Sequence, residues 1–210
     1  MILFRPDGNH WTLVTEPKRR SALLASFNKI DGRHATSRES TQLRECKLPC
    51  YGNTTLLQVR DETWTNKHLK IYYLEDGEDT YVRLNGTSPP IHALNAKLPI
   101  HLDDTNVLWY LSFFCFFVRG DEGPFLVIDD LNNPNLPDDL TTSEKLKTVF
   151  RQPRIFGRDD LGKWRISALI YYSNAVFHGD FLVSSSGTVD MADDTALFGD
   201  LPSKIQVPIA

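Results

Sequence analysis

Residues 107–118 read VLWYLSFFCFFV, an apolar stretch that is interrupted only by Ser112. The acidic pair Asp103-Asp104 precedes it, and carboxylates are favoured at the N-terminus of a helix, where the backbone dipole is positive. Gly120 follows shortly after, and glycine is common just beyond the end of a helix. We therefore expect a helix that is apolar on nearly every face, and such a helix has to be covered on several sides.

The segments after this helix carry strand patterns. Residues 124–128 predict a short buried strand, and residues 141–150 predict a further helix. Residues 164–172, 176–183 and 188–191 are rich in β-branched and aromatic residues and are separated by turns, which predicts an antiparallel meander. One apolar helix beside an antiparallel sheet is typical of an α+β protein.

The order of these elements, from residue 101 onward, resembles that of cystatin-like and NTF2-like folds, in which a curved sheet wraps around a helix. The resemblance concerns the order of elements and no sequence motif. It therefore implies a shape for the C-terminal half of the chain and carries no functional residues with it, because such folds serve enzymes, binders and assembly modules alike.

The N-terminal half predicts a region that is rich in hairpins. Pro6-Asp7-Gly8-Asn9 is typical of a tight turn between two short strands. Thr15 or Glu16 would cap a helix that Pro17 opens, and Asp31-Gly32 would end it. The expected elements are hairpins joining residues 2–5 to 11–15 and 69–74 to 80–84, a helix over residues 17–30 and a surface loop over residues 31–53.

A change of composition near residues 86–100 indicates a boundary between two domains. The first prolines after the second hairpin, Pro89-Pro90, break the strand pattern there. We expect a hairpin-rich domain over residues 1–95 and a domain of helix and antiparallel sheet over residues 96–200. Residues 201–210 carry two prolines and are expected to form a tail.

The charge of the chain argues against nucleic acid as its partner. The net charge of its 210 residues is −4 at pH 7, although residues 1–60 hold 10 Lys and Arg against 5 Asp and Glu. A globally acidic chain binds nucleic acid poorly, and the basic N-terminal segment leaves that hypothesis as a minor alternative. A nucleic acid bound there through residues 17–47 would make binding strongly salt-dependent.

Location is also predicted from the chain. The apolar run at residues 107–118 is shorter than the roughly 20 residues that a membrane span requires. Met1-Ile2-Leu3-Phe4 lacks the basic segment of a secretory signal. Cys46, Cys50 and Cys115 make an odd and small number of thiols, which indicates a reducing compartment. We therefore expect a cytoplasmic protein with no membrane span.

No catalytic or cofactor motif is present. The chain contains no nucleotide-binding glycine loop, no GxSxG and no HExxH. Cys46 and Cys50 have three residues between them and no second pair to complete a zinc site. Residues 130–141 fail as a calcium loop because Asn135 stands where glycine is needed and Thr141 where glutamate is needed. We expect no cofactor and no bound metal.

Three residues are candidates for a catalytic site. His178 and Asp180 share one face of the strand over residues 176–183, opposite Phe177 and Phe181, and a histidine next to a carboxylate can act as an acid–base pair. Asp129 directly follows the buried strand over residues 124–128. The alternative is that all three are polar groups on solvated faces and in turns.

Trp109 and Tyr110 are candidates for ligand contacts, since aromatic side chains commonly line cavities. The alternative is that they belong to the core. The absence of catalytic motifs favours a binding or assembly module over an enzyme, and the aromatic surplus favours a homodimer. The second hypothesis is a small-molecule enzyme or ligand-binding protein with a pocket in the C-terminal domain, with His178, Asp180 and Asp129 as its polar groups.

Overall fold

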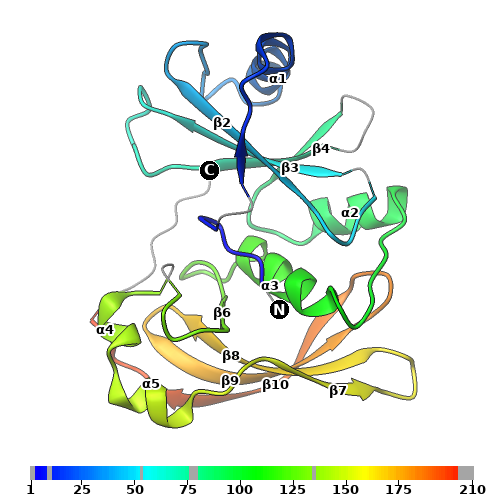
Figure 1. Ribbon diagram of the computed structural model, residues 1–210, viewed down its shortest axis with the longest axis vertical. Coiled ribbons are helices and arrows are strands. Elements are labelled where there is room, and N and C mark those ends of the chain that lie inside the picture. Colours follow the sequence, from blue (N-terminus) through cyan, green and yellow to red (C-terminus); the bar gives the residue numbers. More distant parts are fainter. Residues whose placement is uncertain (1–2, 9–10, 53, 76–79, 134–135, 203–210) are drawn as a thin grey trace. The chain divides into compact units, whose positions relative to one another are not determined.

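The computed structural model describes residues 3–8, 11–52, 54–75, 80–133 and 136–202 (Figure 1). The chain divides into two compact units: unit 1 comprises residues 1–7 and 86–206, and unit 2 comprises residues 8–85 and 207–210. Each unit has its own antiparallel sheet, and helices accompany both, so the protein is of the predicted α+β class. Independent folding of residues 1–95 and 96–200 stays a prediction.

Unit 2 combines a five-stranded sheet with helix α1. Its strands lie side by side in chain order and all pair antiparallel. The predicted helix and the predicted second hairpin, β4 with β5, are confirmed. The elements are β1 (Thr12–Leu13), α1 (Pro17–Ile30), β2 (Thr41–Lys47), β3 (Thr55–Asp61), β4 (Ile71–Glu75) and β5 (Tyr81–Leu84).

Helix α1 begins at a cap that Glu16 supplies. Its carboxylate accepts hydrogen bonds from the backbone N–H groups of Arg19 and Lys18, which lower the pKa of Glu16. A basic side chain at this end opposes the helix dipole. Arg19 offsets that cost by ion pairs with Glu75 at 2.9 Å and Glu45 at 3.0 Å, so the basic start of the helix attaches it to the sheet.

The core of unit 2 lies between α1 and one face of the sheet. Phe27 is 1 % exposed and stacks on Tyr73 of β4 with ring centroids 4.2 Å apart. The same cluster of buried side chains contains Val14, Leu23, Leu24, Leu43, Leu57, Val59, Trp64, Leu69 and Ile71. Burial of this apolar area is what holds α1 on the sheet.

Asp61, at the end of β3, is a buried carboxylate in unit 2 with an exposed fraction of 1 %. It accepts hydrogen bonds from the hydroxyl groups of Ser40 at 2.8 Å and Thr63 at 2.6 Å, and from that of Thr41. Burial raises the pKa of Asp61, but the hydrogen bonds from Thr41, Thr63 and Ser40 together outweigh it and bring the pKa below its ordinary value.

Acid should therefore destabilise unit 2 partly through Asp61. The pKa of Asp61 is lower in the folded than in the unfolded protein. Its contribution to the free energy of unfolding is therefore complete above the unfolded pKa of about 4, and it is lost as the pH falls through the folded pKa. We expect Asp61→Asn to be less stable at pH 7 and to lose less stability between pH 7 and pH 3 than the unmodified protein. Urea unfolding at both pH values measures this, with the exposed Glu62→Gln as control. Equal acid sensitivity of Asp61→Asn and the unmodified protein would contradict the assignment.

Unit 1 contains the second sheet, with strand order β10-β9-β8-β6 and with β7 also paired to β8. All of its strand pairs are antiparallel, and the predicted meander of β8, β9 and β10 is confirmed. Its elements are α2 (Pro89–Lys97), α3 (Val107–Phe117), β6 (Leu126–Ile128), α4 (Asp138–Thr141), α5 (Glu144–Val149), β7 (Arg154–Arg158), β8 (Trp164–Tyr172), β9 (Ala175–Val183) and β10 (Val189–Phe198).

Helix α3 is the predicted apolar helix, and all of its 11 residues are buried. It contacts the sheet at β6 (Figure 1). The N-terminal segment covers another side. The Phe4 ring lies 5.4 Å from Trp109, 5.6 Å from Phe113 and 5.5 Å from Phe117, measured between ring centroids. The backbone N–H of Phe4 donates to Ser112 Oγ at 2.8 Å, and the Ser112 hydroxyl donates in turn to the carbonyl oxygen of Trp109 at 2.9 Å.

Two polar contacts join α3 and the residues before it to the β9–β10 turn and to the start of β8. The Tyr110 hydroxyl donates to the carbonyl oxygen of Gly187, in the turn between β9 and β10, at 2.7 Å. Trp164 of β8 donates its indole N–H to Asp104, just before α3, at 2.6 Å. The acidic pair before the helix thus serves in part as an anchor to the sheet.

The predicted first hairpin is wrong. Residues 3–5 form no strand, and β1 pairs with β2, with Thr12 opposite Glu45. The physical reason lies in Phe4, which is 5 % exposed and gains far more burial among the α3 rings than a two-stranded turn could offer. The turn residue Asn9 lies outside the described residues.

The predicted surface loop over residues 31–53 is also wrong in part, because it contains β2. Thr41 and Leu43 of this strand are buried, while Gln42 and Lys47 are exposed. The alternation is hard to recognise in the sequence because four of the seven residues carry long polar or charged side chains: Gln42, Arg44, Glu45 and Lys47. The structure also adds α2, which starts at Pro89 where a break was expected, and β7, which lies in an expected connection. Proline is well tolerated in the first turn of a helix.

Across the residues that the structure describes, no helix combines the length and apolar character needed to cross a membrane. The cystatin-like or NTF2-like shape expected for the C-terminal half stays a prediction.

Candidate functional site

The site lies on one face of the sheet in unit 1. Side chains of the central strands β8 and β9 alternate between its two faces. Ile166 and Phe181 are partners in register, and each is only 2 % exposed on the core face. The next pair, Ser167 and Asp180, therefore lies on the opposite face, together with Arg165 and His178, two residues away on each strand.

Part of this second face is covered. Helices α4 and α5 lie beside one end of the sheet (Figure 1). Tyr171 on that end is fully buried, and burial together with the negative charge of Asp139 on α4 raises its pKa to about 12. Farther along the same face, Arg165 and Asp180 are exposed.

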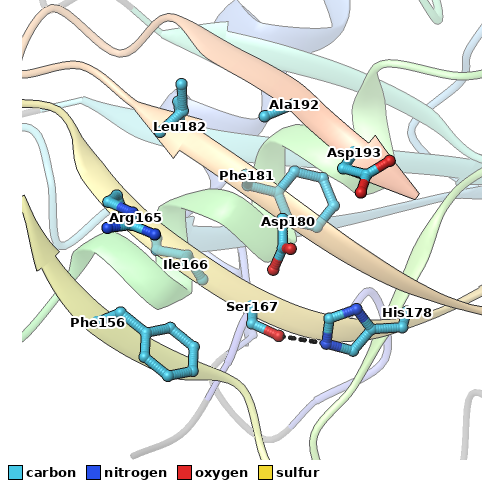
Figure 2. A pocket seen from close by; sticks show the side chains of 10 residues that line it. All are labelled: Phe156, Arg165, Ile166, Ser167, His178, Asp180, Phe181, Leu182, Ala192 and Asp193. Atoms are coloured by element: carbon cyan, nitrogen blue, oxygen red, sulfur yellow. Dashed lines mark hydrogen bonds between the residues drawn. The ribbon is translucent and has the colours of Figure 1, made fainter. Parts of the chain in front are cut away.

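The open part forms a hollow of about 450 Å³. Figure 2 shows Arg165 and Phe156 at one end, His178 and Asp193 at the other, and Ser167 and Asp180 between them. Its volume lies within the range of about 300–1,000 Å³ that is common for small-molecule sites. The lining residues are Phe156, Arg165, Ile166, Ser167, His178, Asp180, Phe181, Leu182, Ala192 and Asp193.

A hydrogen bond joins Ser167 and His178 across the floor of the hollow. Ser167 Oγ lies 2.7 Å from His178 Nε2, and both residues are half-buried (Figure 2). They are diagonal neighbours on adjacent strands, since Ser167 is opposite Asp180 and His178 is opposite Leu169. Both strands are internal to the sheet, so the pair is held on a stiff support.

Two carboxylates stand opposite each other at this site. Asp180 of β9 is paired in register with Asp193 of β10, and both are exposed. Like charges directly opposite on one face repel each other. A register irregularity between Met191 and Asp193 changes the direction of the following β10 side chains, and such bulges commonly re-aim a side chain.

The other end of the hollow is cationic and aromatic. Phe156 of β7 is 58 % exposed, and the guanidinium of Arg154 lies 5.2 Å from its ring centroid. Arg165 is exposed beside it. An exposed aromatic ring next to a guanidinium presents both apolar area and charge to a ligand.

The structure brings only two of the three predicted catalytic residues together. His178 and Asp180 line the hollow, whereas Asp129 does not. Asp129 pairs with Arg5 at 2.8 Å and accepts a hydrogen bond from Asn133 at 3.1 Å. Its contacts therefore join the N-terminal segment to the loop after β6.

The predicted ligand-contact residues lie in the core. Trp109 is 8 % exposed and stacks on Phe113 with 5.6 Å between ring centroids. Tyr110 is fully buried and uses its hydroxyl in the contact with Gly187. Neither side chain lines the hollow.

Sequence reasoning missed Ser167, Arg165, Asp193 and Phe156. The alternation along residues 164–172 was the signal available for Ser167 and Arg165, because it places both on the face opposite Ile166. Nothing in the sequence places Asp193 opposite Asp180, since that pairing depends on the register of β10. Phe156 belongs to β7, which the sequence did not predict.

The surroundings of Ser167 supply few groups for nucleophilic catalysis. Its backbone lies between β7 and β9, paired with Arg154 on one side and Asp180 on the other. Ser167 lies inside a strand and not at a helix N-terminus or a turn, where free N–H groups can form an oxyanion hole. In the described part of the chain, His178 Nδ1 makes no hydrogen bond that would fix the orientation of the ring.

Other reactive groups lie elsewhere. Burial raises the pKa of the Cys46 and Cys115 thiols to about 12, which keeps them protonated and poorly nucleophilic. Among the residues that the structure describes, no group of three or more His, Cys, Asp or Glu side chains is arranged to hold a metal ion.

Comparison of the chain with protein-family models, with curated proteins and with solved structures finds no match in any of the three. The function is therefore argued from the hollow itself.

Proposed function

We propose that unit 1 is a binding module that holds a small ligand, without converting it, in the hollow between Phe156 and Asp193. The observation that carries this proposal is the combination of groups at one place. A hydrogen-bonded Ser167–His178 pair, charges of both signs and an exposed aromatic ring surround a volume of about 450 Å³. Ligand sites typically combine apolar walls with a few convergent polar groups on rigid elements.

A fragment screen tests this proposal. Amide resonances of ¹⁵N-labelled protein are recorded with a library of small polar aromatic compounds. We expect hits to shift amides of residues 165–167 and 178–182, and His178→Ala to weaken them about tenfold through the loss of a hydrogen-bonding group. Met191→Ala is the matched control, since Met191 lines a separate hollow with Phe177 and Ile170. Hits that map only to that second hollow, or a screen without hits, would overturn the proposal.

The second candidate is acyl transfer by Ser167 and His178. The 2.7 Å hydrogen bond favours it, because His178 Nε2 is placed to accept the Ser167 proton while Oγ attacks a carbonyl carbon. The position of Ser167 inside a strand and the lack of a group that orients His178 argue against it. A fluorophosphonate probe separates the two functions. We expect no covalent label on Ser167; a label that disappears in His178→Ala would favour the enzyme.

The compartment and a protein partner belong to the same proposal. Cys46, Cys50 and Cys115 are all free thiols, which supports a reducing, cytoplasmic location. We also propose a homodimer in which a second copy covers Leu161, an apolar side chain that is 83 % exposed and lies outside the hollow. Native mass spectrometry of the intact protein measures the oligomeric state.

A further inference from the structure

The charges at the hollow are separated and are not neutralised by each other. Arg165 stands at one end, and Asp180 and Asp193 stand in its middle and at its other end (Figure 2). In the part of the chain that the structure describes, Arg165 forms no ion pair with either carboxylate. Lys163, its near neighbour, does pair with an aspartate, Asp190, at 2.9 Å. The same face thus holds the Arg165 guanidinium and two anions that are open to a ligand, with the Arg154 guanidinium beside Phe156 at the Arg165 end.

The register gives the backbone spacing of the residues that carry these charges. Arg165 is opposite Leu182, and Ser167 is opposite Asp180, so Arg165 and Asp180 are diagonal neighbours. The Cα atoms of diagonal neighbours on antiparallel strands are about 7–8 Å apart. The opposed pair Asp180 and Asp193 repels itself, and an ammonium group between them would relieve that repulsion.

We propose that the ligand is a small zwitterion of dipeptide size, a claim that rests on the binding function proposed above. The termini of an extended dipeptide are about 7 Å apart, which is about the backbone spacing of Arg165 and Asp180. Its carboxylate lies at Arg165, where a guanidinium can bind it through two hydrogen bonds. Its ammonium lies between Asp180 and Asp193, and an apolar C-terminal side chain packs on Phe156, which is at the Arg165 end.

Three compounds of nearly equal size test the charges one at a time. They are alanyl-phenylalanine, its C-terminal amide, which lacks the negative charge, and its N-acetyl derivative, which lacks the positive charge. Affinities come from titrations that follow the amides of residues 165–167 and 178–182. We expect each modified compound to bind about tenfold more weakly than the dipeptide, as charge-assisted hydrogen bonds at a partly exposed site imply.

Variants assign each charge to its partner. In Arg165→Gln the dipeptide and its amide should bind equally, and in Asp180→Asn with Asp193→Asn the dipeptide and its N-acetyl derivative should bind equally. Arg33→Gln in unit 2 and Asp121→Asn in unit 1 are the controls, since both residues are exposed and lie outside the hollow. They should leave all three affinities unchanged.

The outcomes separate this inference from the proposed function. If all three compounds bind equally at the hollow, the zwitterion is overturned and the binding function stands. The same holds if none of the three binds while fragments still bind there. An amide that binds as tightly as the dipeptide assigns the site to simple cations and also overturns the inference. Failure of both the dipeptide and the fragment screen overturns both proposals.

Discussion

Phe4→Ala should lower the free energy of unfolding of unit 1 by about 3–5 kcal/mol, as removal of a buried phenylalanine ring commonly does. Phe4 is 5 % exposed although it lies near the chain terminus. Its ring contacts Trp109, Phe113 and Phe117 of α3, and also Phe116, at 5.7 Å between centroids. Alanine would leave a cavity against α3, whose residues are all buried.

Urea unfolding followed by tryptophan fluorescence measures this effect, because Trp109 lies against the Phe4 ring. Phe156→Ala is the control: its ring is 58 % exposed, so its loss should change stability by less than about 1 kcal/mol. A midpoint for Phe4→Ala equal to that of Phe156→Ala would show that the N-terminal segment does not belong to the core of unit 1.

Gly187→Ala should destabilise unit 1 by about 2–4 kcal/mol, the sum of backbone strain and a disturbed buried hydrogen bond. Gly187 has a φ of +81°, in the left-handed region that favours glycine. A Cβ there would stand 2.3 Å from Asn95 Nδ2 and 2.6 Å from the Tyr110 hydroxyl oxygen. That hydroxyl donates to the Gly187 carbonyl, so the contact between α3 and the β9–β10 turn would have to move.

Gly162→Ala isolates the backbone part of this effect. Gly162 has a nearly equal φ of +76°, but no atom lies within 4 Å of the Cβ position. We expect it to cost only about 1 kcal/mol, which is the strain of a non-glycine residue in this conformation. Thermal and urea unfolding of both variants give the comparison. Equal losses of stability in the two variants would mean that Asn95 and Tyr110 move aside at little cost and that backbone strain explains the whole effect.

The elements that the sequence predicted share a local cause. The apolar stretch, in which Ser112 is the one interruption, predicts that every residue of α3 is buried, although it does not say what covers the helix. The cap at Glu16 and the proline at position 17 define the start of α1 through the backbone of adjacent residues. Alternation along β9 likewise places His178 and Asp180 on one face. Each of these features depends on residues within a few positions of one another.

The features that were missed depend on residues far apart in the chain. Phe4 packs on α3 more than 100 positions later, so its four-residue segment reads as a strand when taken alone. β2 is concealed because its charged side chains find partners on other elements, as Glu45 does with Arg19. Asp129 reads as a site residue after a buried strand, yet Arg5 engages it.

The sequence by itself determined the α+β class, the buried helix, the meander and the face on which His178 and Asp180 lie, because helix capping and side-chain alternation act over short ranges. Only the tertiary structure decided that Ser167 meets His178, that Asp193 stands opposite Asp180 and that Phe156 borders the same hollow. Those neighbours come from β8, β10 and β7. Strand register and sheet order set their contacts, and both depend on the burial of the whole sheet.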